Sequence, residues 1–214
     1  MSRSARNLTA AVAVAALLWF FMFTPWVACK PNFWFMMSCS AVILTALALL
    51  FSGGKRDVLK IEKPLLQLAA GIVLAFLLWG VFWVGDKLSA MMFDFARPEV
   101  DAVYSMKHGL PHWAIAVLLL FLIGPAEEFF WRGYVQRTFS GLFHGKNAGF
   151  TAFVVTALIY ALVHVWSLNF MLVMAALVAG CVWGFIYWLC PKALPALIVS
   201  HALWDALVFV ILPI

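Results

Sequence analysis

Six ionisable side chains lie within long apolar runs of this sequence, where an unpaired charge is costly in lipid and is therefore usually functional or tightly paired. They are Glu127, Glu128, Arg132, His164, His201 and Asp205. A carboxylate and a histidine that face water can activate it as general bases, and a second histidine can donate to a developing oxyanion. These residue types therefore suit hydrolysis of a peptide bond by activated water.

Helical spacing separates the two adjacent glutamates. Glu128 and Arg132 are four residues apart, so they share a helix face, with the acid on the favoured N-terminal side. Glu127 is rotated from Glu128 by about 100°, which points it elsewhere. We predict that Glu128 and Arg132 form a structural ion pair and that Glu127 is the working acid, facing a cavity.

Two more pairs have the same i,i+4 spacing. Tyr160 precedes His164 in YALVH, and His201 precedes Asp205 in HALWD. The second spacing allows the carboxylate to orient the imidazole or to work beside it.

The segment before the two glutamates contains Gly124 and Pro125. Proline lacks a backbone donor and clashes with the carbonyl four residues earlier, so we predict a kink there. Such a break can admit water at membrane depth where protein surrounds it.

Other hydrolytic motifs are absent from the sequence. It contains neither the GxSxG pattern of a serine nucleophile nor the HExxH pattern of zinc proteases. The spacing still allows zinc to be bound by His164, His201 and Asp205, as two histidines and one carboxylate. The cysteines lack CxxC pairing and are interpreted as small core residues; they are Cys29, Cys39, Cys181 and Cys190.

Composition indicates the elements that must position these groups. The 214 residues are 66% hydrophobic and 11% charged, whereas soluble domains are about 45–50% apolar and about 25% charged. We predict an all-α, polytopic transmembrane helix bundle, with residues 1–214 as a single integral-membrane domain. Its seven predicted spans, each near the ~20 residues that cross a bilayer, are 8–28, 33–52, 64–84, 112–136, 148–166, 169–190 and 193–212.

The basic residues predict the orientation. With the N-terminus in the cytoplasm, ten Lys and Arg fall on or near the cytoplasmic side and four, Lys30, Lys87, Arg97 and Lys107, fall outside. The net charge of +5 is therefore explained by topology, and no nucleic-acid partner is indicated. The expected partners are the lipid bilayer and a membrane-associated protein or peptide. The connection 85–111 is either a plain linker or an interfacial amphipathic helix.

Three motifs, EEFFWRG (127–133), YALVH (160–164) and GFIYWLCPKALPALIVSHALWDAL (184–207), resemble those of the CAAX protease and bacteriocin-processing (CPBP) family of intramembrane endopeptidases. The resemblance covers about residues 112–212, the expected catalytic core. It implies that Glu127 activates the attacking water, assisted by His164, and that His201 and Asp205 stabilise the oxyanion. Glu128 and Arg132 match the supporting acid and arginine, and no catalytic metal is implied.

Two positions depart from the family pattern. Tyr160 stands where phenylalanine is usual, which adds a hydroxyl near the cavity. Asp205 stands where asparagine is frequent, and an ionised aspartate cannot donate to an oxyanion. It must be protonated, orient His201, or ligate a metal.

Two other functions use the same residues. A proton-coupled transporter or channel would use the Glu/His relay but would need a path across the membrane. A catalytically silent immunity or scaffold protein would keep the fold alone. If the compact chain is bacterial, its site is the cytoplasmic membrane and peptide maturation is expected rather than CAAX processing.

Overall fold

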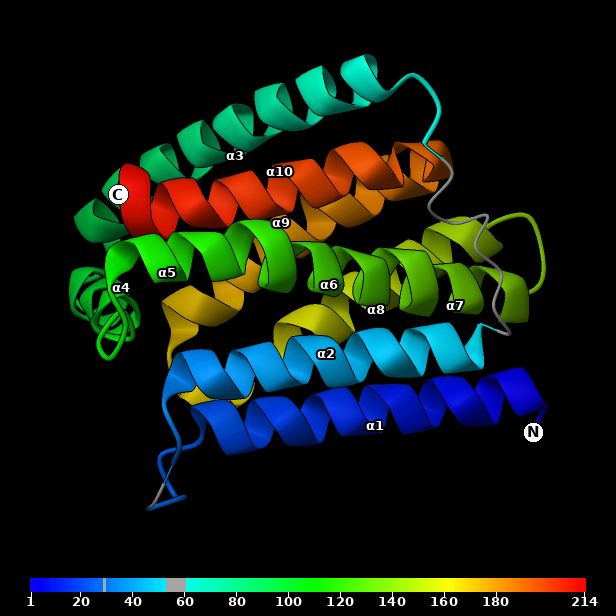
Figure 1. Ribbon diagram of the computed structural model, residues 1–214, viewed down its shortest axis with the longest axis horizontal. Helices are drawn as coiled ribbons and strands as arrows, with labels where there is room; N and C mark the ends of the chain where they lie inside the picture. Colours follow the sequence, from blue (N-terminus) through cyan, green and yellow to red (C-terminus); the bar gives the residue numbers. More distant parts are fainter. Residues whose placement is uncertain (29, 53–60) are drawn as a thin grey trace.

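The computed structural model describes residues 1–28, 30–52 and 61–214, which form helices and no strand. Among these residues, seven helical segments are long and apolar enough to cross a membrane (Figure 1). They are α1 (Arg3–Phe23), α2 (Phe33–Phe51), α3 (Pro64–Met92), the fourth span (His112–Leu142), α8 (Ala148–Leu162, extended by a 3₁₀ turn to Ser167), α9 (Phe170–Leu189) and the last span (Pro191–Ile211, containing α10, Leu194–Ala206). The predicted fold class is confirmed: the chain is an integral, multi-pass membrane protein.

Three predicted spans have the wrong bounds. The fourth runs to Leu142 rather than to residue 136. The first begins and ends about five residues earlier than predicted, because the side chain of Ser2 caps α1 by accepting from the amide of Ala5. The third runs to Met92 rather than to residue 84. Asp86 stays helical there because it is ion-paired with Arg97, a long-range contact that a hydropathy pattern does not contain.

The fourth span continues through Gly124 and Pro125, where the sequence predicts a kink, and its helical geometry changes on both sides of this point. It contains α5 (His112–Leu118), α6 (Gly124–Glu128) and α7 (Arg137–Leu142), joined by π-helical turns at Leu119–Ile123 and Phe129–Gln136. These wider turns stand on both sides of Pro125, so the helix accommodates the proline without ending.

Gly124 brings the fourth span close to α10. A Cβ at this position would lie 2.6 Å from the Cα atom of Ala202, a distance that side chains do not tolerate. Only glycine therefore permits this approach. The close approach sets the two glutamates of α6 beside the histidine of α10.

A short helix, α4 (Ala96–Ser105), crosses the end of the bundle at the left of Figure 1. Its Glu99 carboxylate accepts from the amide of Met171 at the start of α9, and its carbonyl accepts from the side chain of Asn169. Of the two alternatives for the 85–111 connection, a linker or a helix, the structure has a helix, which is shorter than the connection and docked against α9.

Several residues used in the sequence argument, Cys29, Lys55, Arg56 and Lys60, lie outside the described residues. The other three cysteines, Cys39, Cys181 and Cys190, are free thiols.

Candidate active site

Glu127 lies on α6, buried at the centre of the bundle. The hydroxyl of Tyr160, on α8, donates to its Oε2 atom at 2.9 Å. Glu127 also lines the main cavity, whereas its neighbour Glu128 does not. The two adjacent carboxylates therefore face different surroundings, as the rotation between them predicts.

Glu128 is fully buried behind the cavity wall and has two cationic or donor partners. Its Oε1 atom lies 2.7 Å from Nη1 of Arg132 and 2.9 Å from Nδ1 of His201. The guanidinium also donates to the carbonyl of Gly180 on α9, at 3.3 Å. The ion pair expected from the i,i+4 spacing thus forms and ties the fourth span to both α9 and α10.

His201 is held on three sides. Besides its contact with Glu128, its Nε2 atom lies 3.4 Å from Oδ2 of Asp205, one turn further along α10. The indole of Trp183 stacks on the imidazole, with ring centroids 4.0 Å apart, and is itself fixed by a hydrogen bond to Ser200. A carboxylate oxygen therefore stands at each ring nitrogen of His201.

His164 lies just after α8, at the start of the 3₁₀ turn that extends it, and has neutral partners. Its Nδ1 atom lies 2.8 Å from the carbonyl of Tyr160, and its Nε2 atom lies 3.1 Å from the indole nitrogen of Trp19 on α1. A carbonyl only accepts and an indole N–H only donates. These two contacts therefore specify the neutral tautomer of His164 that carries its proton on Nδ1 and accepts at Nε2.

A cavity of about 450 Å³ brings these groups together. Its polar wall contains five of the seven predicted site residues: Glu127, Tyr160, His164, His201 and Asp205. Most of the remaining wall is aromatic or aliphatic. The volume is in the range of small-ligand sites, and a few converging polar groups in an apolar pocket are typical of them.

His164, His201 and Asp205 do not fit a zinc site in this arrangement. A histidine ligates zinc through a ring lone pair, but the acceptor nitrogen of His164 takes the indole proton of Trp19. Both ring nitrogens of His201 face carboxylates. Within the described residues, no three His, Cys, Asp or Glu side chains gather as a metal-binding group.

The end of the cavity nearest α4 carries a second polar cluster, at the junction of α3 and α4. Arg97 lies 3.0 Å from Asp86 and 2.8 Å from Asp101, and its hydrogen bond to Asp101 is the main cause that raises the pKa of Arg97. Burial raises the pKa of Tyr104, which lines the cavity beside this cluster. Arg97 is therefore charged over the working pH range and holds α4 against α3.

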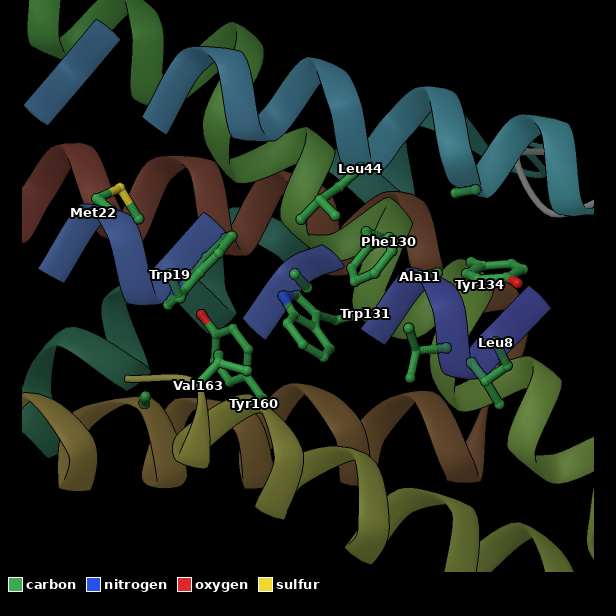
Figure 2. Packing of buried hydrophobic residues seen from close by; sticks show 14 residues of the cluster. Leu8, Ala11, Trp19, Met22, Leu44, Phe130, Trp131, Tyr134, Tyr160 and Val163 are labelled. Carbon is green, nitrogen blue, oxygen red and sulfur yellow. The ribbon is translucent and has the colours of Figure 1, made fainter. Parts of the chain in front are cut away.

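Trp19 is the site residue that sequence reasoning missed. It is 1% exposed and lies 145 positions from His164, outside the three motifs. Figure 2 shows it among the buried side chains that also include Trp131 and Tyr160. No spacing or motif signals its role, since a tryptophan in the first span of such a chain is an ordinary core residue.

The fold and the cavity define a class: a polytopic helical membrane protein with buried glutamate and histidine side chains at the centre of its bundle. The family model for type II CAAX prenyl endopeptidase Rce1-like proteins matches residues 109–207, and this segment is an Rce1-like domain. The resemblance to the CPBP family is thereby confirmed. All seven predicted site residues lie within the matched segment, and Trp19 lies outside it. The family implies an intramembrane protease and does not favour a transporter.

Neither the curated proteins nor the solved structures give a match to this chain.

Proposed function

We propose that this protein is an intramembrane endopeptidase that cleaves membrane-associated proteins or peptides with a water molecule activated by Glu127. The observation that carries the proposal is the burial of Glu127 in an apolar cavity, with Tyr160 as its donor and two histidines on the same wall. As part of the same proposal, we place the protein in a bacterial cytoplasmic membrane.

In the proposed reaction, the oxygen of water attacks the scissile carbonyl carbon while Glu127 takes one proton. The carbonyl oxygen becomes an oxyanion, to which His201 donates from the ring nitrogen nearest Asp205. The tetrahedral intermediate then collapses, the carbon–nitrogen bond breaks, and Glu127 returns its proton to the departing amine.

Each remaining side chain has an assisting role in this proposal. The Nε2 lone pair of His164 is occupied by the indole of Trp19, so His164 assists by donating from Nδ1 to the carbonyl of Tyr160, whose hydroxyl fixes the carboxylate of Glu127. Asp205 orients the imidazole of His201 before the substrate binds, and in this proposal its carboxyl group is protonated when the oxyanion takes the same ring N–H. Glu128 and Arg132 support His201 from behind the cavity wall.

We also propose that the reaction uses no catalytic metal. The support is the donor set described above, because His164 and His201 have no ring lone pair aimed at a common point.

The test is cleavage of a fluorogenic peptide library by the purified protein in detergent, for wild type and for Glu127→Gln. Loss of a positioned base costs about 10²- to 10⁴-fold, so kcat should fall by about 10²-fold or more while thermal unfolding is unchanged. Asp94→Asn is the matched control, since it makes the same carboxylate-to-amide change at an exposed position and should cleave normally.

Normal cleavage by Glu127→Gln would refute the proposed base. Repeating the assay with a chelator tests the metal-free proposal separately: activity should survive, and loss that zinc restores would show that His164, His201 and Asp205 rearrange into ligands.

A further inference from the structure

The cavity occupies one end of the bundle only. Glu127 is near the middle of its span, about 20 Å from the His112 end at 1.5 Å per residue, and the cavity extends from there toward α4. Every lining residue lies in the half of its helix nearest α4. The lining residues of the spans are Phe23 of α1 and those within 33–37 of α2, 81–89 of α3, 119–127 of the fourth span, 160–164 at the end of α8, 170–179 of α9 and 201–209 of the last span. The other lining residues are Phe93, residues within 100–106, and Ile214.

The two ends of the bundle can be defined by chain connections (Figure 1). The cavity end contains α4, the connections that follow α1 and α8, and Ile214. The closed end contains the N-terminus, the end of α2, the start of α3, and the connections that follow α7 and α9. No residue from the closed end lines the cavity.

The two ends also differ in charge. Nine basic residues belong to the closed end with only Asp57 and Glu62 as acids, and four belong to the cavity end with four acids. The nine are Arg3, Arg6, Lys55, Arg56, Lys60, Lys63, Arg137, Lys146 and Lys192. Three of them, Lys55, Arg56 and Lys60, and the acid Asp57 lie outside the described residues and count through their place in the sequence. Short loops rich in Lys and Arg stay in the cytoplasm, so the closed end is the cytoplasmic one.

Ion pairing strengthens this contrast at the cavity end. Arg97 is bound to Asp86 and Asp101, and Lys87 is bound to Asp86. Two of the four cations there are therefore neutralised within the fold. At the closed end Lys192 is paired with Glu62, whereas Arg3, Arg6 and Lys146 are exposed.

We infer that the cavity opens away from the cytoplasm and that the substrate is an apolar peptide segment presented on the non-cytoplasmic side of the membrane. This inference rests on the proposed peptidase function and names its substrate class. A lipidated protein that remains on the cytoplasmic face would meet the closed end, where no described residue lines the cavity. An exported peptide would instead reach the apolar cavity past α4, whose Val100, Val103 and Tyr104 line it.

Sidedness can be measured without any substrate. In a background with all four cysteines replaced by alanine, single cysteines are introduced by His108→Cys at the cavity end and His144→Cys at the closed end. The two histidines are exposed and have no assigned role, so they form a matched pair. A third variant, Ser89→Cys, reports on the cavity lining itself.

Intact cells are treated with a membrane-impermeant maleimide before or after permeabilisation. We expect His108→Cys and Ser89→Cys to be labelled equally in both conditions and His144→Cys to be labelled only after permeabilisation. The reverse pattern, or labelling of both histidine variants in intact cells, would overturn the inference. So would a Ser89→Cys variant that stays unlabelled while His108→Cys reacts.

The second arm adds a membrane-impermeant fluorogenic peptide with an apolar core to intact cells that express wild type or Glu127→Gln. We expect wild type alone to cleave it, without an increase on lysis. Cleavage that requires lysis would overturn the inferred substrate side while leaving the peptidase proposal intact. If the wild-type protein is inactive before and after lysis, the proposed peptidase function is refuted. The labelling result would still decide the orientation of the protein.

Discussion

His164 and His201 line one cavity but are held by opposite kinds of partner. His201 has a carboxylate oxygen at each ring nitrogen, from Glu128 and Asp205. His164 has a backbone carbonyl at one nitrogen and the indole of Trp19 at the other. The first histidine is part of a buried network of charges, and the second belongs to a chain of neutral hydrogen bonds.

This difference between the partners of the two histidines indicates which substitutions should affect the site most. Removing one member of a buried charge network leaves the others unpaired in a medium of low dielectric, which is expensive. Removing one neutral hydrogen bond costs only about 1 kcal/mol. Substitutions around His201 should therefore have larger effects than substitutions around His164.

The largest expected effect is that of Arg132→Met on stability. The substitution keeps much of the side-chain volume but leaves the carboxylate of Glu128 buried with His201 as its one remaining partner among the described residues. Breaking a buried ion pair from one side costs about 3–5 kcal/mol. We expect a loss of this size in the free energy of unfolding, measured by denaturant titration in detergent.

Arg137→Met is the matched control, since Arg137 lies on the same helix, five residues further on, and is exposed. It should change stability by less than about 0.5 kcal/mol. Equal effects of the two substitutions would contradict the conclusion that the buried charge network around His201 is especially sensitive to change.

The next largest effect is that of His201→Asn on turnover. Asparagine can keep a donor near Nδ1, facing Glu128, but removes the nitrogen near Asp205 that we propose to bind the oxyanion. Loss of one such donor costs about 10²- to 10³-fold in kcat. Peptide cleavage should fall by that factor with KM little changed.

Ser200→Ala tests whether the loss is specific. It removes the hydroxyl that fixes Trp183, next to His201, without touching a proposed catalytic group. We expect its kcat to remain close to that of wild type. A His201→Asn variant no slower than Ser200→Ala would remove His201 from the oxyanion site.

The spacing of residues along the sequence was sufficient to predict the contacts of the site that lie within a single helix. The i,i+4 rule placed Arg132 on Glu128 and Asp205 beside His201, and the rotation of Glu127 away from Glu128 placed it in a different environment. These relations hold within a single helix, so they survive errors in span boundaries. Hydropathy likewise identified the seven spans, because lipid requires apolar runs of a certain length.

Contacts between distant helices could not be predicted in this way. The bond from Trp19 to His164 and the contact of His201 with Glu128 depend on how the spans pack. The geometry of the fourth span around Pro125 depends on packing as well. Proline disfavours a helix locally, but packing of Gly124 against Ala202 and adjacent π-helical turns keep the fourth span continuous.

The smallest expected effect is that of Trp19→Phe, which tests the neutral hydrogen bonds around His164. The substitution removes the indole donor to Nε2 of His164, so nothing on α1 holds the ring in the tautomer that accepts there. One neutral hydrogen bond contributes about 1 kcal/mol, which corresponds to about five-fold in rate. We expect kcat to fall by about that factor with KM unchanged, because Trp19 does not line the main cavity.

Trp131→Phe separates this positioning role from packing alone. Trp131 belongs to the same buried cluster and loses the same volume on substitution, but its indole nitrogen has no hydrogen-bond partner among the described residues. Both variants should lose similar stability, and only Trp19→Phe should lose kcat. If the two variants lose kcat equally, Trp19 acts through packing. If Trp19→Phe is faster than wild type, the indole restrains His164 rather than preparing it, since a freed Nε2 would then be the better acceptor.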